Sequence, residues 1–334
     1  MEEFIRNYCT CESDNKSKHI IENHVDTILT NILQPIFQKE AVNHPILSRK
    51  PKSKYGTDDF IDKQEWKTNN YVDILMWITD NISAKKLESN LHLILPPIMI
   101  VLDDYDIEYK IKGIKMVHKM ISLLDSSFIS RNGLDNVFFE SLFKCTSYLS
   151  QDRDEPLLRV TYACLLDLLA KRKKDQKTTE LYERVLKDGI VTGFIYAGEK
   201  IKFLPVLIKP ISVLYEELGI IGVQYLKAIV PILCDSISMY SGHNPAIKEI
   251  NLMAAQSLII IIKKCWPRIP AYKGKIIQAI AKAWTYYFNK KDDTMCQLLK
   301  ELYRIFEAAC QGQEKADKDA LVAFNPSVFE PLFT

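Results

Sequence analysis

Four carboxylates stand close together in the sequence, at Asp103, Asp104, Asp106 and Glu108. Clustered carboxylates can hold a divalent metal ion, and a calcium-binding loop is the nearest known arrangement. Such a loop needs glycine at its sixth position and glutamate at its twelfth, but counting from Asp104 these positions hold Tyr109 and Lys115. The required ligands are therefore missing, and we predict that this cluster binds no metal.

The residues on both sides of the cluster indicate a corner between two helices instead. After the acids, apolar residues recur every three or four positions, at Ile107, Ile111, Ile114, Val117, Ile121 and Leu124. That period is typical of an amphipathic helix. Asp106 stands where an N-cap belongs, and acids at this end of a helix complement its dipole. We predict that Asp103, Asp104 and Asp106 cap the corner and pair with basic residues of adjacent repeats.

Other motifs that could carry chemistry fail on spacing or context. His19 and His24 flank a glutamate as in a zinc peptidase helix, but they are five residues apart rather than four, and we expect them to diverge. Gly219 and Gly222 match a G-x-x-G loop in letters only, and we expect them to end a helix. No nucleotide-binding or nucleophile-elbow motif occurs in the sequence. We predict a protein that is not an enzyme and uses no metal and no cofactor.

Composition favours an all-α protein. The chain has 334 residues but only 11 glycines, whereas sheet and nucleotide-binding folds usually spend more glycine on turns. The eight cysteines are irregularly spaced, and we expect reduced thiols in an intracellular protein. No signal peptide or membrane span is expected, because the longest uncharged stretch, near Leu252–Ile262, is shorter than the roughly 20 residues a span needs. We expect a cytoplasmic and nuclear location.

Charge gives little reason to expect a nucleic-acid partner. The net charge is +2, which produces no strong field. Lys171–Lys174 is a tight basic run that follows a helix expected over Leu157–Ala170, where cations complement the helix dipole. A role of this run in nuclear import stays open.

A short pattern at helix starts recurs along the chain. It reads DIEYK at Asp106–Lys110, EPLLR at Glu155–Arg159 and NPAIK at Asn244–Lys248. The basic residues that close the pattern are 49 and then 89 residues apart, and the second gap is about twice a unit of 45. Paired helices with a period of about 40–47 residues are typical of HEAT and armadillo arrays. We predict an α-solenoid of such repeats, in which Lys110, Arg159 and Lys248 ladder to acidic residues.

The predicted organisation has two parts. Residues 1–60 hold one helix, over His19–Lys39, and a mobile basic loop, whereas residues 61–334 form the solenoid. Helices inside the solenoid are apolar on much of their circumference because they contact both neighbouring repeats. We expect Leu166, in one of these helices, to be buried between repeats.

Aromatic residues near the C-terminal end of the chain could contact a partner. The candidates are Trp266, Arg268, Trp284, Tyr286 and Tyr287. Interface cores favour tryptophan, tyrosine and arginine. The alternative is that these side chains are ordinary core residues between repeats.

Several segments together resemble a known family. These are LPPIMIVLDDYDIEYKIKGIKMVHKMI at Leu95–Ile121, RNGLDNVFFESLFKCTSYL at Arg131–Leu149, EPLLRVTYACLLDLL at Glu155–Leu169 and KKCWPRI at Lys263–Ile269. In their order they resemble the second Tel-two-interacting protein family, whose members are the small subunit of the Triple T cochaperone complex. The residues before Trp66 do not match.

The resemblance implies a non-enzymatic scaffold that binds the two larger Triple T subunits, of the Tel-two and Tti-one types. Through them it implies contact with the heat-shock chaperone and its R-two-TP adaptor, and support for the stability of phosphatidylinositol-3-kinase-related kinases such as mTOR, ATM and ATR. A different HEAT-type adaptor, for example in nuclear transport or trafficking, is the alternative. A helical enzyme is disfavoured by the absence of a catalytic motif from the sequence.

Overall fold

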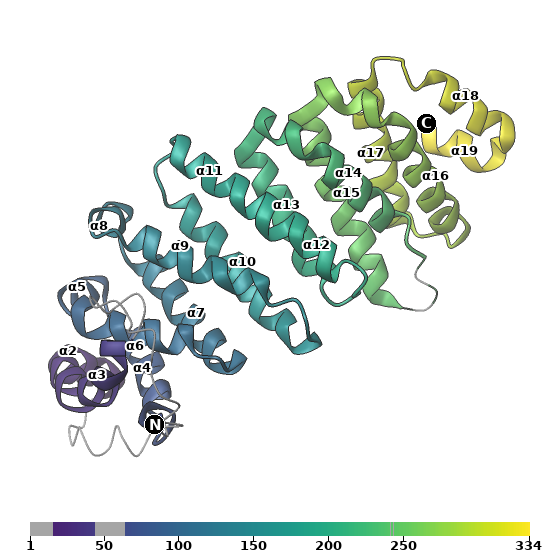
Figure 1. Cartoon of the computed structure of the whole chain (residues 1–334). Coiled ribbons are helices and arrows are strands. Elements are labelled where there is room, and N and C mark those ends of the chain that lie inside the picture. The colour runs from purple at the N-terminus through teal and green to yellow at the C-terminus, as the bar shows by residue number, and fades with distance from the viewer. Residues whose placement is uncertain (1–15, 44–63, 241, 243) are drawn as a thin grey trace, which may run out of the picture. The chain divides into compact units, whose positions relative to one another are not determined.

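The computed structural model describes residues 16–43, 64–240, 242 and 244–334 (Figure 1). The described residues form helices and turns and contain no strand, which confirms the all-α prediction for this part of the chain. Contacts divide the chain into two compact units. Unit 1 comprises Met1–Cys145 and Ala163–Arg172, and unit 2 comprises Thr146–Tyr162 and Lys173–Thr334.

Unit 1 begins with a helical run that packs on its later helices. Its elements are α2 (Lys16–Ile28), η1 (Leu29–Leu33), α3 (Gln34–Asn43), η2 (Glu65–Lys67), α4 (Tyr71–Asn81), α5 (Ala84–Ser89), α6 (Leu91–Asp103), α7 (Ile107–Leu123), α8 (Ser126–Arg131) and α9 (Leu134–Lys144). The helix predicted over His19–Lys39 lies within α2, η1 and α3, and this run contacts α4 and α6. The predicted basic loop and the boundary near residue 60 fall outside the described residues.

Unit 2 consists of helices in successive contact. Its elements after the short η3 (Cys145–Ser147) are η4 (Asp152–Asp154), α10 (Glu155–Ala170), α11 (Gln176–Arg184), η5 (Val185–Val191), α12 (Thr192–Ala197), α13 (Leu204–Leu218), η6 (Gly219–Tyr225), α14 (Leu226–Ile237), α15 (Pro245–Cys265), η7 (Trp266–Tyr272), α16 (Lys273–Asn289), α17 (Asp293–Cys310), α18 (Lys315–Phe324) and α19 (Pro326–Phe333). The C-terminal half of α10 belongs to unit 1.

The core of unit 2 follows from apolar helices that touch more than one neighbour. The helix α15 contacts α13, α14 and α17, and α16 contacts α14 and α17. In α15, Ile250, Ala254, Leu258 and Ile261 are fully buried. A helix that is covered by several neighbours needs apolar residues around much of its circumference, which is why its sequence shows a broad apolar face rather than a narrow stripe.

One residue of α10 faces a different side of the helix from the one predicted. Leu166 is only half-buried, whereas Leu165 and Leu169 are buried. The prediction that Leu166 lies in the core is therefore wrong. In an apolar run with two adjacent leucines, the helical period does not reveal which of them faces the core, because that depends on where the neighbouring helices lie.

Two stretches are long and apolar enough to cross a membrane by length and composition, Leu204–Ile237 and Pro245–Asn289. Each stretch contains two α-helices joined by a 3-10 segment, η6 or η7. Their apolar residues include core residues of unit 2 such as Leu207, Ile211 and Leu258, which are fully buried against neighbouring helices. A core helix passes the same composition test, so these stretches are weak evidence for a span.

Candidate functional site

The acid cluster forms the corner between α6 and α7. Asp106 is the N-cap of α7, and its carboxylate accepts a hydrogen bond of 2.9 Å from the backbone N–H of Glu108. The buried Asp104 accepts a bond of 2.8 Å from the backbone N–H of Asp106. The half-buried Asp103 is the last residue of α6. The corner thus uses its carboxylates to satisfy backbone donors that the start of a helix leaves without intrahelical partners.

A lysine from an earlier segment binds the same corner. The ammonium group of Lys67 lies 2.9 and 2.8 Å from the two carboxylate oxygens of Asp104. It also lies over the rings of Tyr105, Tyr109 and Trp66, at 4.2, 5.0 and 5.1 Å from their centroids. Carboxylate and aromatic faces both stabilise a cation. The site that the acids offer to a cation is therefore occupied by a side chain of the same chain.

Two further corner residues let α6 and α7 approach closely. The buried Lys110 donates a hydrogen bond of 3.2 Å to the carbonyl oxygen of Leu102. A Cβ atom added to Gly113 would lie 2.5 Å from the Cα atom of Leu102, which no real side chain tolerates without a shift of backbone. Glycine at position 113 is thus required by the contact between the two helices.

The other two basic residues of the repeated pattern have partners of different kinds. Lys248 forms an ion pair of 2.6 Å with Asp292, which is the N-cap of α17. Arg159 pairs with Glu155 inside α10, one turn away, so its predicted ladder to an adjacent repeat is not formed. Arg159 is largely exposed, and the spacing of four residues brings these two side chains together on the helix surface.

Asp292 carries a perturbed carboxyl group at this junction. Burial by itself would raise its pKa, but hydrogen bonds from Lys248 and from the backbone N–H of Met295 outweigh burial and lower the pKa below its ordinary value. The ionised carboxylate therefore fastens the start of α17 to α15.

Two lysines bind backbone carbonyls that precede them by a similar distance along the chain, at the end of α7 and in the segment after η3. Lys171 donates to the carbonyl oxygen of Leu124 at 3.0 Å, 47 residues earlier, and Lys200 donates to that of Leu149 at 2.7 Å, 51 residues earlier. Lys171 thereby satisfies a carbonyl left over at the end of α7 and complements the helix dipole. Many side-chain hydrogen bonds between elements span 36 to 51 residues, which indicates a recurring arrangement.

A buried amide fixes the end of α14. The side-chain amide of Asn251 donates to the carbonyl oxygens of Ile237 and Met239, at 2.9 and 3.4 Å. Its own carbonyl oxygen accepts a bond of 2.6 Å from the hydroxyl group of Tyr287. The sequence analysis missed Asn251, although an asparagine inside the apolar run NLMAAQSLIIII is a signal, because a buried amide needs partners.

Three of the five candidate partner-contact residues reach the surface. Trp266 is 49% exposed, Arg268 is exposed and Tyr286 is half-buried. Trp284 and Tyr287 are buried core residues, so the prediction that they contact a partner does not agree with their position. Trp284 donates from its indole nitrogen to the carbonyl oxygen of Val328 at 2.7 Å. Their apolar bodies and single polar groups are both used inside unit 2.

The basic run after α10 is largely engaged in contacts. Lys171 binds the carboxyl end of α7, Arg172 pairs with Asp135 at 2.6 Å, and Lys174 pairs with Glu217 at 2.9 Å. The side chain of Arg172 is largely buried. The structure thus gives this run a stabilising role, and a role in nuclear import stays open.

The described residues contain no group of three His, Cys, Asp or Glu side chains that could hold a metal ion. His19 and His24 do not diverge as predicted, since their ring centroids are 5.9 Å apart on α2. Burial raises the pKa of the Cys145 thiol to about 11, which disfavours the reactive thiolate. Cys9 and Cys11 lie outside the described residues.

Comparison with known proteins identifies the family. The model of the Tti2 family matches residues 1–241, which is more than half of the chain. The chain belongs to the Tti2 family. The family resemblance that the sequence indicated is thereby confirmed. The match begins at residue 1, so the expectation that the residues before Trp66 do not match is wrong, and the segment Lys263–Ile269 lies beyond the match.

Curated relatives of this Tti2 family member carry the name TELO2-interacting protein 2. The protein from Mus musculus is 23% identical over 231 residues, which cover 66% of this chain and 43% of the relative. The protein from Rattus norvegicus is 22% identical over 271 residues, which cover 78% of this chain and 49% of the relative. The protein from Homo sapiens is 20% identical over 228 residues, covering 66% and 43%. The chain thus spans about half the length of these relatives or less.

Some of the features described above lie inside the region that the Tti2 family model matches, and others lie beyond it. It includes the corner between α6 and α7 and extends to the end of α14. Trp266, Arg268 and Tyr286 lie beyond residue 241. The family assignment therefore rests on the region that precedes α15, and it gives no support of its own to the predicted contact at η7 and α16.

Proposed function

We propose that this chain is a non-enzymatic scaffold subunit of the Triple T cochaperone complex. The observation that carries the proposal is membership of the Tti2 family, together with relatives whose name describes them as TELO2-interacting. The chain would act by holding the Tel-two-type and Tti-one-type subunits. Through them it would support the maturation and stability of phosphatidylinositol-3-kinase-related kinases such as mTOR, ATM and ATR, with the heat-shock chaperone and R-two-TP adaptor as indirect partners, in the cytoplasm and nucleus.

The proposal includes an α-solenoid of HEAT- or armadillo-like repeats. Two observations support it: the described residues are helical, and their polar contacts between elements recur at 36 to 51 residues, close to the length of one such repeat. In such an array each repeat contacts its neighbours and presents an extended surface for other proteins. A scaffold of this kind needs no catalytic group.

Copurification tests the proposal. The tagged full-length chain is expressed with the two larger Triple T subunits from the same organism, and we expect both to be recovered with it in fixed proportion. An unrelated HEAT-repeat protein with the same tag is the control. Recovery of neither subunit by the folded chain would refute the proposal, and recovery of transport factors instead would favour the alternative of a different HEAT-type adaptor.

A further inference from the structure

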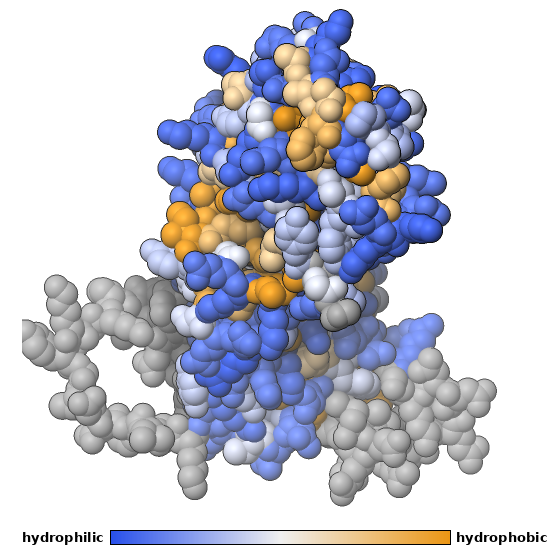
Figure 2. Space-filling model, turned by 90° about the vertical axis from the view of Figure 1, so that its right-hand side faces the viewer, coloured by the Kyte–Doolittle hydropathy of each residue, from blue (hydrophilic) through white to orange (hydrophobic). Residues whose placement is uncertain are grey.

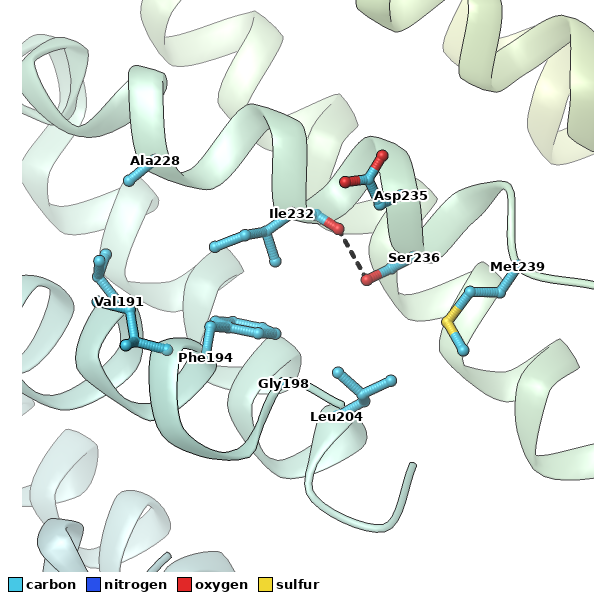
Figure 3. A pocket seen from close by; sticks show the side chains of 10 residues that line it. Val191, Phe194, Gly198, Leu204, Ala228, Ile232, Asp235, Ser236 and Met239 are labelled. Carbon is cyan, nitrogen blue, oxygen red and sulfur yellow. Dashed lines mark hydrogen bonds between the residues drawn. The ribbon is translucent and has the colours of Figure 1, made fainter. Parts of the chain in front are cut away.

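An apolar groove opens on unit 2 where a short helix leaves α14 partly uncovered (Figure 3). Its volume is about 460 Å³. The lining side chains come from the end of η5, from α12, from the start of α13, from α14 and from Met239 after it. They include Val191, Phe194, Leu204, Ala228 and Ile232. The volume lies within the usual range of about 300–1,000 Å³ for binding sites.

The groove exists because α12 is short and is held close to α13. A Cβ atom added to Gly193 would lie 2.6 Å from a methyl carbon of Leu207, so glycine permits this close contact. The helix ends at Ala197, and residues 198–203 connect it to α13. One face of α14, with Ala228 and Ile232 half-buried, therefore has no helix lying fully across it among the described residues.

Large apolar side chains are exposed at Ile195, which lines the groove, and at residues next to lining residues in sequence. Ile195 and Tyr196 are 73% and 71% exposed, and Tyr240, next to Met239 in sequence, is 68% exposed. Figure 2 shows apolar residues gathered in patches between hydrophilic ones on the face that it draws. Tyr240 packs edge-on against Tyr286, one of the predicted contact residues, with ring centroids 5.5 Å apart. Exposed apolar patches with a polar rim mark interaction sites.

The charges on the groove favour a basic occupant. Asp235 is the one charged residue among the described groove residues. Its side chain is 71% exposed and lies 3.2 Å from Lys275, which leaves it accessible to a second cation. The neighbouring lysines on the segment after α12 are engaged elsewhere, because Lys200 binds the Leu149 carbonyl and Lys202 binds Asp152. A carboxylate at the edge of an apolar surface favours a lysine or arginine on the partner.

The helical walls of the groove favour a helical partner segment over an extended peptide. The groove is walled by helices whose backbone groups are hydrogen-bonded within them, and the described lining offers no strand edge to which a β-strand could add. A polyproline segment prefers several aromatic rings, but Phe194 is the one aromatic residue in the lining. Apolar side chains spaced by three or four residues on a helix match a groove of this kind.

We propose that the groove between α12 and α14 binds an amphipathic helix of another Triple T subunit, with apolar anchors in the groove and a lysine or arginine at Asp235. This inference rests on the proposed function, because it takes the helix from one of the two larger subunits. The groove lies within residues 1–241, so it belongs to the region that defines the family in this chain.

The test uses the full-length chain and the two larger subunits, purified and offered separately and together. Ala228→Trp fills the groove, Ile195→Asp places a charge on its rim, and Asp235→Lys reverses the charge. Each is expected to weaken binding about tenfold or more, as loss of an interface anchor does. Phe324→Asp, which changes an 84% exposed residue of α18, is the matched control and should bind as the wild type does. Circular dichroism and the melting temperature should stay unchanged in all four variants.

A photo-reactive phenylalanine at position 195 identifies the occupant. We expect it to crosslink to a partner segment that is helical and has apolar residues every three or four positions with a basic residue beside them. Wild-type affinity of folded Ala228→Trp and Ile195→Asp variants, or a crosslink to a second copy of this chain, would overturn the inference while the proposed function survives. If the wild-type chain binds neither subunit, the proposed function fails, and the groove assignment fails with it.

Discussion

Leu165 and Leu166 are adjacent in α10, but Leu165 is buried and Leu166 is half-buried. Truncating each of them therefore tests which leucine belongs to the core. Leu165→Ala should lower the free energy of unfolding by roughly 2–5 kcal/mol, because it leaves a cavity among packed side chains. Leu166→Ala should cost about 1 kcal/mol or less, since half of the side chain already faces solvent. Urea unfolding of both variants checks this. Equal losses would show that the register of α10 is different.

Asp292 gives a prediction about pH. Its lowered pKa means that its ion pair with Lys248 contributes stability above the pKa of the unfolded chain, about 4, and that this contribution is lost as the pH falls through the lower pKa of the folded protein. Asp292→Asn keeps an acceptor for the Met295 N–H but removes the charge. At neutral pH the variant should be less stable by about 1 kcal/mol.

The pH dependence distinguishes the contribution of the ion pair between Asp292 and Lys248 from that of the N-cap hydrogen bond that Asp292 accepts. The difference in unfolding free energy between wild type and Asp292→Asn should shrink as the pH falls from about 5 to 3. Thermal or urea unfolding at several pH values measures it. A difference that stays constant over this range would mean that the ion pair contributes nothing and that only the shape of the cap matters.

At the scale of elements, Gly113 tests the packing of α6 on α7, and Gly274 is its control. Gly113→Ala should destabilise unit 1 by roughly 1–3 kcal/mol or more, because its new methyl group would meet the backbone of Leu102. Gly274→Ala, in α16, meets nothing within 4 Å and should be neutral or stabilising by up to about 1 kcal/mol. Circular dichroism melting of the two variants compares them. Similar melting temperatures would contradict the close approach of α6 and α7.

The same corner shows why an acid cluster in a sequence is a poor guide to a metal site. Asp104 and Asp106 are adjacent enough to suggest shared ligands, yet Asp106 binds the first turn of α7 and Asp104 binds Lys67. The cation that balances Asp104 comes from 37 residues earlier in the chain. Spacing alone excluded the calcium loop, but only the packing of η2 on the corner supplied the partner.

At the scale of the whole molecule, the predicted contact near η7 can now be tested with surface residues alone. Trp266→Ala and Arg268→Glu change exposed side chains and should leave helicity and melting unchanged. If this surface contacts the large Triple T subunit, each should lower its recovery several-fold, as expected for interface anchors. Quantitative copurification measures this, with Phe324→Asp as the control. Full recovery by both folded variants would remove this surface from the interface.

Tyr287→Phe changes a buried residue, in contrast to the exposed Trp266 and Arg268. Its hydroxyl group is buried against Asn251, so the variant should lose about 1 kcal/mol of stability and keep its partners. A loss of binding without a loss of stability would show that the residue reaches the surface in the complex.

The sequence by itself determined the helical class, the corner at Asp106 and the family. These features depend on local periodicity, on capping chemistry and on residue order, all of which are written along the chain. Tertiary structure decided which leucine of α10 is buried, that Trp284 and Tyr287 are core, and that Arg159 pairs within its own helix. It also decided that a groove remains beside α14. The physical reason is that burial depends on which helices come to lie over a given face, and those helices are tens of residues away in sequence.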